Sequence, residues 1–147
     1  MVAYFDTSAL IKRYFNEQGS KEVIENYFRP DISILTSSIT HAEVYSTFSR
    51  VHKEGHISKR RLEELQHIFE SDWSRFAVVE FGIDVRAQIP KLIEDVYVRG
   101  ADLIHLSTVA AVTKRGVDLV FVCTDKKLKN AALDIGISCD DLLLSKL

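Results

Sequence analysis

Short apolar runs, each followed by a longer amphipathic run, constrain the fold of this chain more than any other feature. The runs are VAYF (2–5), ISILT (32–36), FAVVEF (76–81) and LVFVC (119–123). They are nearly continuous in apolar residues rather than alternating, which indicates strands buried on both faces, as in a parallel sheet. Parallel strands need crossover connections, which are usually helices. The sequence therefore predicts an α/β fold in three layers around a central, mostly parallel sheet.

The amphipathic runs predict the helices between these strands. Ser37 or Ser38 can cap the third helix, Gly55 can end it, and Ser58 can cap the fourth. The predicted helices span residues 7–15, 19–28, 37–55, 58–73, 84–98, 101–114 and 125–136. In folds of this class, sites form at the carboxyl ends of the strands, so the chemistry is expected there.

Length and composition predict one globular domain, residues 1–147, with a net charge of −2. Bulk charge gives no sign of nucleic-acid binding, so any basic surface has to be local. Cys123 and Cys139 are too far apart for a CxxC motif, and no disulfide scaffold is expected. No apolar run approaches the ~20 residues that span a bilayer, and Asp6 interrupts any N-terminal signal pattern. We expect a cytoplasmic protein with no membrane partner.

Four acidic residues occupy the same kind of position, at a strand end or a helix start. Asp6 follows the first strand and Asp125 follows the last, while Glu43 and Asp102 lie near the starts of helices. Each acid alone is explained by helix capping, which is worth roughly 0.3–1 kcal/mol. If the strands are neighbours, however, all four acids converge on one crevice.

Clustered carboxylates repel one another, and helix capping does not require such a cluster. At ~6 Å and an effective dielectric constant of ~20, each pair costs roughly 3 kcal/mol. A divalent cation would relieve this repulsion, and an all-oxygen ligand set favours Mg²⁺ or Mn²⁺ over zinc. Such ions activate water and stabilise charge on phosphate, so the acids indicate a nuclease or a phosphatase.

Four segments of the sequence resemble, in order, the acidic motifs of PIN-domain ribonucleases. They are YFDTSALIKRYF, TSSITHAEVYSTFSR, VRGADLIHLSTVAA and FVCTDKKLKNAA, and more narrowly they resemble VapC toxins of toxin–antitoxin pairs. The resemblance implies a sheet of about five parallel strands and a pocket for one or two Mg²⁺ or Mn²⁺ ions. It also implies metal-dependent RNA cleavage, a homodimer and an antitoxin partner. Asp6, Glu43, Asp102 and Asp125 fall on the four catalytic, metal-binding positions.

Hydroxyl groups next to the acids are the candidate supporting residues. Thr7 and Ser8 follow Asp6, and family members often carry a hydroxyl there. Two residues before the fourth acid the family commonly has Ser or Thr, whereas this chain has Cys123 and places the hydroxyl at Thr124. The basic helix predicted at 58–73 is covered by no motif, and the sequence assigns it no role.

Basic residues near the acids are candidate RNA contacts, although solvated helix faces explain most basic clusters in the chain. These candidates are Lys12, Arg13, Arg99, Lys126 and Lys127. His105 lies one helical turn after Asp102 and could orient it or contact RNA. A packed or surface histidine is the expectation.

Other functions fit the sequence less well. A haloacid-dehalogenase-like phosphatase needs a second Asp two residues after the first, where this chain has Ser8. A phosphoacceptor domain needs paired acids after the first strand and one after the third, where this chain has Gly82. Two alternatives stay open: a non-toxin PIN nuclease in RNA processing, and a non-catalytic PIN scaffold that binds RNA or a partner.

Overall fold

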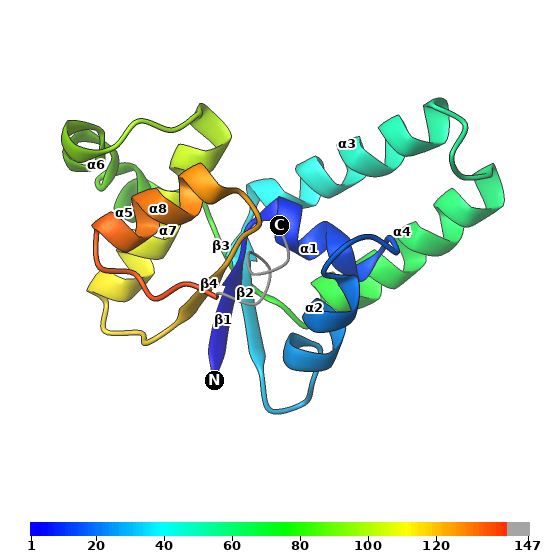
Figure 1. The fold of residues 1–147 in the computed structure, drawn as a ribbon, viewed down its shortest axis with the longest axis horizontal. Coiled ribbons are helices and arrows are strands. Elements are labelled where there is room, and N and C mark those ends of the chain that lie inside the picture. Colours follow the sequence, from blue (N-terminus) through cyan, green and yellow to red (C-terminus); the bar gives the residue numbers. More distant parts are fainter. Residues whose placement is uncertain (141–147) are drawn as a thin grey trace.

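A parallel sheet forms the centre of the protein in a computed structural model that describes residues 1–140 (Figure 1). Within that range the sheet has four strands: β1 (Val2–Phe5), β2 (Ser33–Ser37), β3 (Ala77–Val79) and β4 (Val120–Val122). Their order is β3-β2-β1-β4, and every pair is parallel. The predicted α/β architecture with a parallel sheet is confirmed.

The predicted number of about five strands exceeds the four found between residues 1 and 140. Next to β4 the sheet continues only as a single parallel bridge, between Phe121 of β4 and Cys139. Two hydrogen bonds support this bridge, from Phe121 N to Ser138 O (2.8 Å) and from Asp140 N to Phe121 O (2.9 Å). One bridge is too short to make a strand. The end of the predicted domain, residues 141–147, lies outside the described residues.

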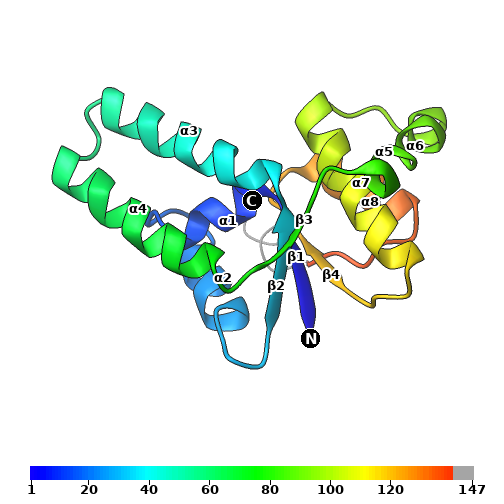
Figure 2. The ribbon, with the colours of Figure 1, turned by 180° about the vertical axis from the view of Figure 1, so that it is seen from behind.

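Helices cover both faces of the sheet, so the fold has three layers (Figures 1 and 2). One face carries α1 (Thr7–Leu10), the 3₁₀ helix η1 (Ile11–Arg13), α2 (Ser20–Tyr27), α3 (Ile39–Lys53) and α4 (Lys59–Trp73). The other carries α5 (Ile83–Arg86), α6 (Ile89–Asp95), α7 (Gly100–Lys114) and α8 (Lys126–Asp134). No helix in the described part of the chain is long and apolar enough to cross a membrane.

The prediction of one helix over residues 84–98 is wrong, because two short helices occupy this stretch. Pro90 lies in the first turn of α6. Proline has no backbone N–H to give to the preceding turn and its ring crowds that turn, so a helix begins at this residue more readily than it continues through it. The predicted helix 7–15 is also shorter, since α1 ends at Leu10 and gives way to η1.

The core divides into two apolar clusters, one on each face of the sheet. Ala3 and Phe5 of β1 belong to the cluster under α1 to α4, while Tyr4 between them belongs to the cluster under α7 and α8. All three are fully buried. Successive side chains of a strand point to opposite faces, so the continuous apolar run is what a strand covered on both sides requires.

The helices α3 and α4 form a hairpin that projects away from the sheet in Figures 1 and 2. Aromatic rings hold the two helices together, with the Phe48 and Phe69 ring centroids 6.0 Å apart and nearly perpendicular. At the base of the hairpin, Glu70 of α4 accepts a hydrogen bond from Tyr45 Oη (2.7 Å) and lies 2.8 Å from His41 Nε2. Helix α4, to which the sequence assigned no role, is thus a packing partner for α3. It is not basic overall, because its three Lys and Arg residues are outnumbered by four Asp and Glu residues.

Candidate active site

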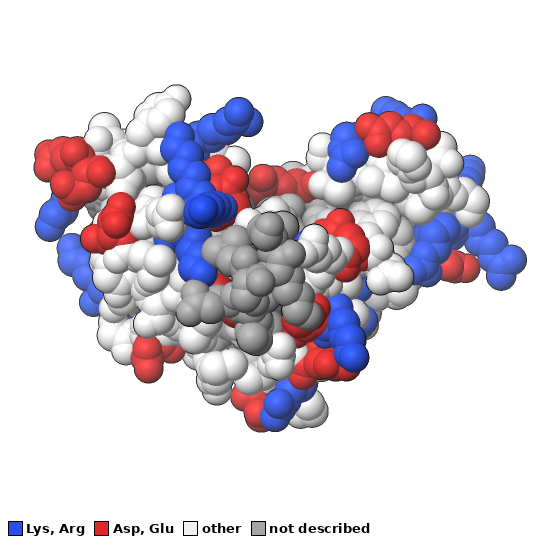
Figure 3. Space-filling model, viewed as in Figure 1, with Lys and Arg blue, Asp and Glu red and all other residues white. Residues whose placement is uncertain are grey.

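The four acidic residues lie at or just beyond the carboxyl edge of the sheet. Asp6 follows β1 and Asp125 follows β4 by three residues, while Glu43 lies in the second turn of α3 after β2. Asp102 lies in the first turn of α7. Figure 3 shows acidic side chains on the floor of a hollow between the two helical layers, with basic side chains along one wall.

Asp6 is held in place by hydrogen bonds to both carboxylate oxygens. Oδ1 accepts from the backbone N–H of Ala9 (2.9 Å), so Asp6 caps α1. The Ser8 hydroxyl lies 3.0 Å from Oδ1 and 2.8 Å from Oδ2, and Thr124 Oγ1 donates to Ser8 Oγ (2.8 Å). Two of the predicted supporting hydroxyls therefore form a chain that links the segment after β4 to the acid after β1.

The carboxylates of Asp6 and Asp102 are electrostatically strained. Burial raises the pKa of Asp6 to about 6, and the negative charge of Asp102 adds to the rise. Burial also raises the pKa of Asp102, followed by the charges of Asp125 and Glu43, while the guanidinium of Arg99 opposes the rise. Asp102 thus lies close enough to the other three acids for their charges to interact, as expected for acids gathered at one edge of the sheet.

Glu43 is held in its ionised form by neighbouring donors. Thr7 Oγ1 donates to Glu43 Oε1 (2.6 Å), and His105 Nε2 lies 3.0 Å from the same oxygen. Burial would raise the pKa of Glu43, but the hydrogen bonds from His105 and Thr7 outweigh it and lower that pKa. Both bonds end on Oε1, so Oε2 takes no part in them. Thr7 therefore supports Glu43, whereas Ser8 supports Asp6.

His105 is buried, as expected for a packed histidine, but it also connects to the site. Its Nδ1 lies 2.9 Å from the hydroxyl of Tyr4, and both side chains are at most 2 % exposed. Ionised Glu43 can only accept hydrogen bonds, so His105 Nε2 donates to it. In the neutral imidazole Nδ1 is then the acceptor, and the Tyr4 hydroxyl donates to it. His105 thus orients Glu43 rather than Asp102.

Asp125 caps α8, with its Oδ1 accepting from the backbone N–H of Leu128 (2.8 Å). Its side chain is exposed, unlike that of Asp6. Cys123, in the position of the family's hydroxyl, is buried, and its thiol lies 3.8 Å from the carbonyl oxygen of Asp125. Burial raises the pKa of Cys123, so the thiol is neutral and only a weak donor.

A cavity of about 730 Å³ opens beside these groups, between α1 and α3. Its lining includes Thr7, Ser8, Glu43, Thr124 and Arg50. Arg50 was missed as a candidate RNA contact, although its spacing of seven residues from Glu43 places both on one face of α3. It forms an ion pair with Glu54 (3.1 Å) and is largely exposed.

The five basic residues predicted as RNA contacts divide into two groups. Arg99 precedes α7, while Lys126 and Lys127 begin α8, so these three flank Asp102 and Asp125. Lys12 instead pairs with Glu17 (3.1 Å) at the end of η1. Arg13 pairs with the buried carboxylate of Asp72 (Nε to Oδ2, 3.2 Å) and lies over the ring of Phe28. The arrangement favours the first group.

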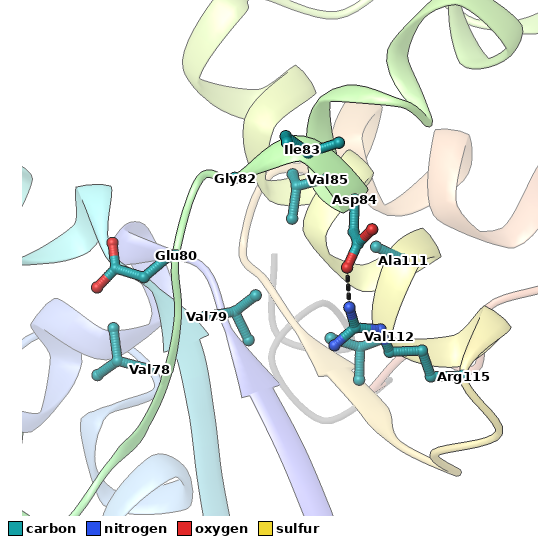
Figure 4. Close-up of a pocket in the computed structure, with 10 residues that line it drawn as sticks. All are labelled: Val78, Val79, Glu80, Gly82, Ile83, Asp84, Val85, Ala111, Val112 and Arg115. Atoms are coloured by element: carbon teal, nitrogen blue, oxygen red, sulfur yellow. Dashed lines mark hydrogen bonds and ion pairs between the residues drawn. The ribbon is translucent and has the colours of Figure 1, made fainter.

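A second cavity, of about 590 Å³, lies between β3, α5 and α7 (Figure 4). Val79, Val85 and Val112 form much of its wall, and Asp84 pairs with Arg115 at its rim. None of the four clustered acids lines it. The candidate active site is therefore the acidic hollow at the carboxyl edge of the sheet.

The carboxylate and hydroxyl oxygens of this hollow match the ligand chemistry of Mg²⁺ or Mn²⁺. Among residues 1–140, however, no three acidic, histidine or cysteine side chains are already arranged as ligands of one ion. Mg²⁺ usually keeps several of its waters and takes one or two carboxylates directly. The residues present therefore fit a hydrated ion held by a few carboxylates.

A comparison with known families identifies this arrangement. The family model described as "PIN domain" matches residues 3–133. The chain belongs to the PIN-domain family. All four acids lie within the matched range.

Curated proteins and solved structures resemble this PIN domain. Ribonuclease VapC45 of Mycobacterium tuberculosis is 27 % identical over 111 residues, which are 76 % of each chain. The structure of VapBC2 from Rickettsia felis, bound to a DNA fragment from its promoter, aligns with 95 % of this chain and 98 % of its own, at 17 % identity and a TM-score of 0.66. VapC20 of M. tuberculosis, described as a sarcin-ricin loop cleaving toxin, aligns with 88 % of this chain and 94 % of its own, at 15 % identity and a TM-score of 0.60. At this identity the two structures show a shared fold.

Proposed function

We propose that this PIN domain is a metal-dependent endoribonuclease that hydrolyses phosphodiester bonds in RNA. The observation that carries the proposal is the position of Asp6, Glu43, Asp102 and Asp125 at or just beyond the carboxyl edge of the sheet. The charges of Asp125 and Glu43 act on Asp102 there, and the charge of Asp102 acts on Asp6. A cation bound among these carboxylates would offset the repulsion that contributes to the raised pKa values of Asp6 and Asp102. The name of VapC45, a ribonuclease, supports RNA as the substrate, and VapC20 is described as a sarcin-ricin loop cleaving toxin.

Asp6 and Asp102 are the residues proposed to bind Mg²⁺ or Mn²⁺ directly, with Glu43 and Asp125 contributing partly through water. When bound, such an ion activates a water molecule and stabilises the charge that develops on phosphate. The chain's own contribution is to orient the carboxylates. Ser8 and Thr124 fix Asp6, while Thr7 and His105 fix Glu43 and keep it ionised. Ionised Glu43 can accept a proton or a hydrogen bond from the attacking water.

We further propose that the protein is the toxin of a type II toxin–antitoxin pair, acts as a homodimer in the cytoplasm and is a single domain over residues 1–147. Its match to structures described as VapBC and as a toxin-antitoxin complex, one of them bound to a promoter DNA fragment, supports an antitoxin partner. The test is expression of the protein with and without the product of a small neighbouring gene. Growth arrest that the neighbour relieves would support the toxin role, and normal growth in both strains would leave a PIN nuclease of RNA processing.

Cleavage of RNA with Mg²⁺ or Mn²⁺ tests the nuclease proposal. The wild type should cleave labelled single-stranded RNA, and both a chelator and Asp6→Asn should abolish cleavage. Asp118→Asn is the matched control, because this exposed acid precedes β4 at the opposite edge of the sheet. Cleavage that survives chelation and the Asp6 substitution would overturn the proposal.

A non-catalytic scaffold is the second candidate, and one observation favours it. Asp6 and Asp125 already serve as helix caps, and within the described residues the acids are not assembled as a ready ligand set. A titration with Mn²⁺ separates the two readings. Binding of the ion that Asp6→Asn weakens supports the enzyme, whereas RNA binding with no metal binding supports the scaffold.

A further inference from the structure

Tyr97 is an exposed aromatic side chain that the sequence analysis did not single out. It lies between α6 and α7 and is 80 % exposed, the most exposed of the large apolar and aromatic side chains among the described residues. The ammonium group of Lys127 lies over its ring, 4.5 Å from the centroid. A single exposed aromatic side chain is common on protein surfaces. Tyr97 is distinguished by the lysine over its ring and by the cavity that it lines.

The Tyr97–Lys127 pair joins the two segments that carry Asp102 and Asp125. Tyr97 lies three residues before α7, whose first turn holds Asp102. Lys127 lies in the first turn of α8, whose cap is Asp125. The pair therefore joins two segments that lie within five residues of Asp102 and two residues of Asp125 along the chain, and Lys126 lines the same cavity.

A cavity of about 480 Å³ adjoins this pair, a volume in the range of small-ligand sites. Its lining combines the Tyr97 ring and Lys127 with the amide of Asn130 and the carboxylates of Asp95 and Asp134. The two carboxylates would repel a phosphate inside the cavity. They can, however, accept hydrogen bonds from the amino group of a base, and the Asn130 amide can both donate and accept.

We propose that Tyr97 and Lys127 form a nucleobase subsite beside the candidate active site. An unpaired base of the RNA stacks on the Tyr97 ring with its polar edge toward Asn130 and the two carboxylates, while Lys127 contacts the neighbouring phosphate. Base stacking on aromatic rings is the usual way in which proteins hold single-stranded RNA. The subsite deepens the proposed function, on which it rests, because it selects single-stranded RNA with a free base near the cleaved bond.

The alternative is that Lys127 and Tyr97 only fasten the α6–α7 segment to α8. The two readings differ in what they affect. If the pair only fastens the segment, substituting Tyr97 or Lys127 lowers thermal stability and leaves RNA affinity unchanged. If Tyr97 forms a base subsite, substituting it lowers RNA affinity, and only for RNA that carries a base at one particular position.

The test measures binding of a labelled RNA hexamer, oligo(A), by fluorescence anisotropy in a chelator at low salt. Tyr97→Ala should weaken binding roughly 5- to 150-fold, and Tyr97→Phe should bind as the wild type does. A series of hexamers with one abasic nucleotide at each position in turn then locates the contact. At the position that contacts Tyr97, the losses of binding free energy from the abasic nucleotide and from Tyr97→Ala should not be additive, because both changes remove the same interaction.

Lys127→Ala should reduce the slope of log affinity against log salt by about 0.7, the contribution of one phosphate contact to a single strand. Arg60→Ala is the matched control, since this basic side chain is exposed on α4. Three outcomes would each overturn the subsite. They are wild-type affinity in Tyr97→Ala, additive losses of binding free energy at every abasic position, and no RNA binding by the wild type. Because the assay needs no cleavage, binding that depends on Tyr97 in a protein that never cleaves RNA would refute the nuclease and leave the subsite standing.

Discussion

Replacing Asp6 with Asn is expected to stabilise the protein at neutral pH while it removes a candidate metal ligand. Asn caps helices as well as Asp does, and its carbonyl oxygen can keep the bond from Ala9 N–H. Ser8, which donates to both oxygens of Asp6, can turn to accept from the new amide. The substitution thus preserves the local structure and removes one buried charge.

The pKa of Asp6 sets the size of this effect. Burial, assisted by the charge of Asp102, raises that pKa from 3.8 to about 6. Each pH unit of difference between folded and unfolded states corresponds to about 1.4 kcal/mol, so ionised Asp6 costs the folded state roughly 3 kcal/mol. Between pH 3.8 and about 6 the folded state binds more protons than the unfolded state. The free energy of unfolding therefore falls as pH rises through this window, and the loss is complete above it.

Thermal and urea denaturation of the wild type and Asp6→Asn from pH 4 to pH 8, in a chelator, measures this loss. The variant should gain on the wild type as pH rises, reaching roughly 6–12 °C in melting temperature for a chain of this size. Asp125→Asn is the control, because it exchanges an exposed helix cap of the same kind. A difference between Asp6→Asn and the wild type that stays constant with pH would refute the reasoning.

Three further outcomes are expected. Mn²⁺ should raise the melting temperature of the wild type more than that of Asp6→Asn, and an equal rise in both would argue against Asp6 as a ligand. His105→Ala should slow RNA cleavage, because it releases Glu43 from its orienting hydrogen bond. Tyr4→Phe should slow cleavage less, because the ring of His105 stays in place. A His105→Ala rate equal to that of the wild type in single-turnover assays would contradict this role. Phe69→Ala should cost about 3–5 kcal/mol in urea denaturation, because it empties a buried site between α3 and α4, and a cost under about 1 kcal/mol would show that the hairpin does not depend on this ring.

The sequence predicted the positions of the strands and acids well, for a physical reason. Asp6 and Asp125 follow apolar runs that can only be buried strands, and parallel neighbours bring such residues to one edge. The two departures have different causes. The pairing of Cys139 with Phe121 is a single long-range bridge that no local pattern records. The separation of α5 from α6 does have a local signal, Pro90 in the first turn of α6, which the prediction of one helix over 84–98 ran through.

Within the site, the sequence indicated which residue types support the acids but not which acid each one supports. Thr7 and Ser8 are neighbours, yet they bond to Glu43 and Asp6, because successive side chains at a helix start point in different directions. The link from Tyr4 through His105 to Glu43 joins three elements and has no local signal. Tyr97 was missed for the same reason, since its partner Lys127 is distant in sequence.

The turn that closes the α3–α4 hairpin is a suitable position for attaching a label or a tag. Gly55 has a φ of +82°, and Glu54 and His56 beside it are exposed. Figure 1 shows this turn at the end of the hairpin that lies away from the sheet. Exposed loop tips tolerate inserted segments, and lengthening a loop adds little to its closure entropy. A fluorophore or an affinity peptide inserted after Gly55 would therefore label or immobilise the protein for RNA-binding and metal-binding assays without occupying the acidic hollow.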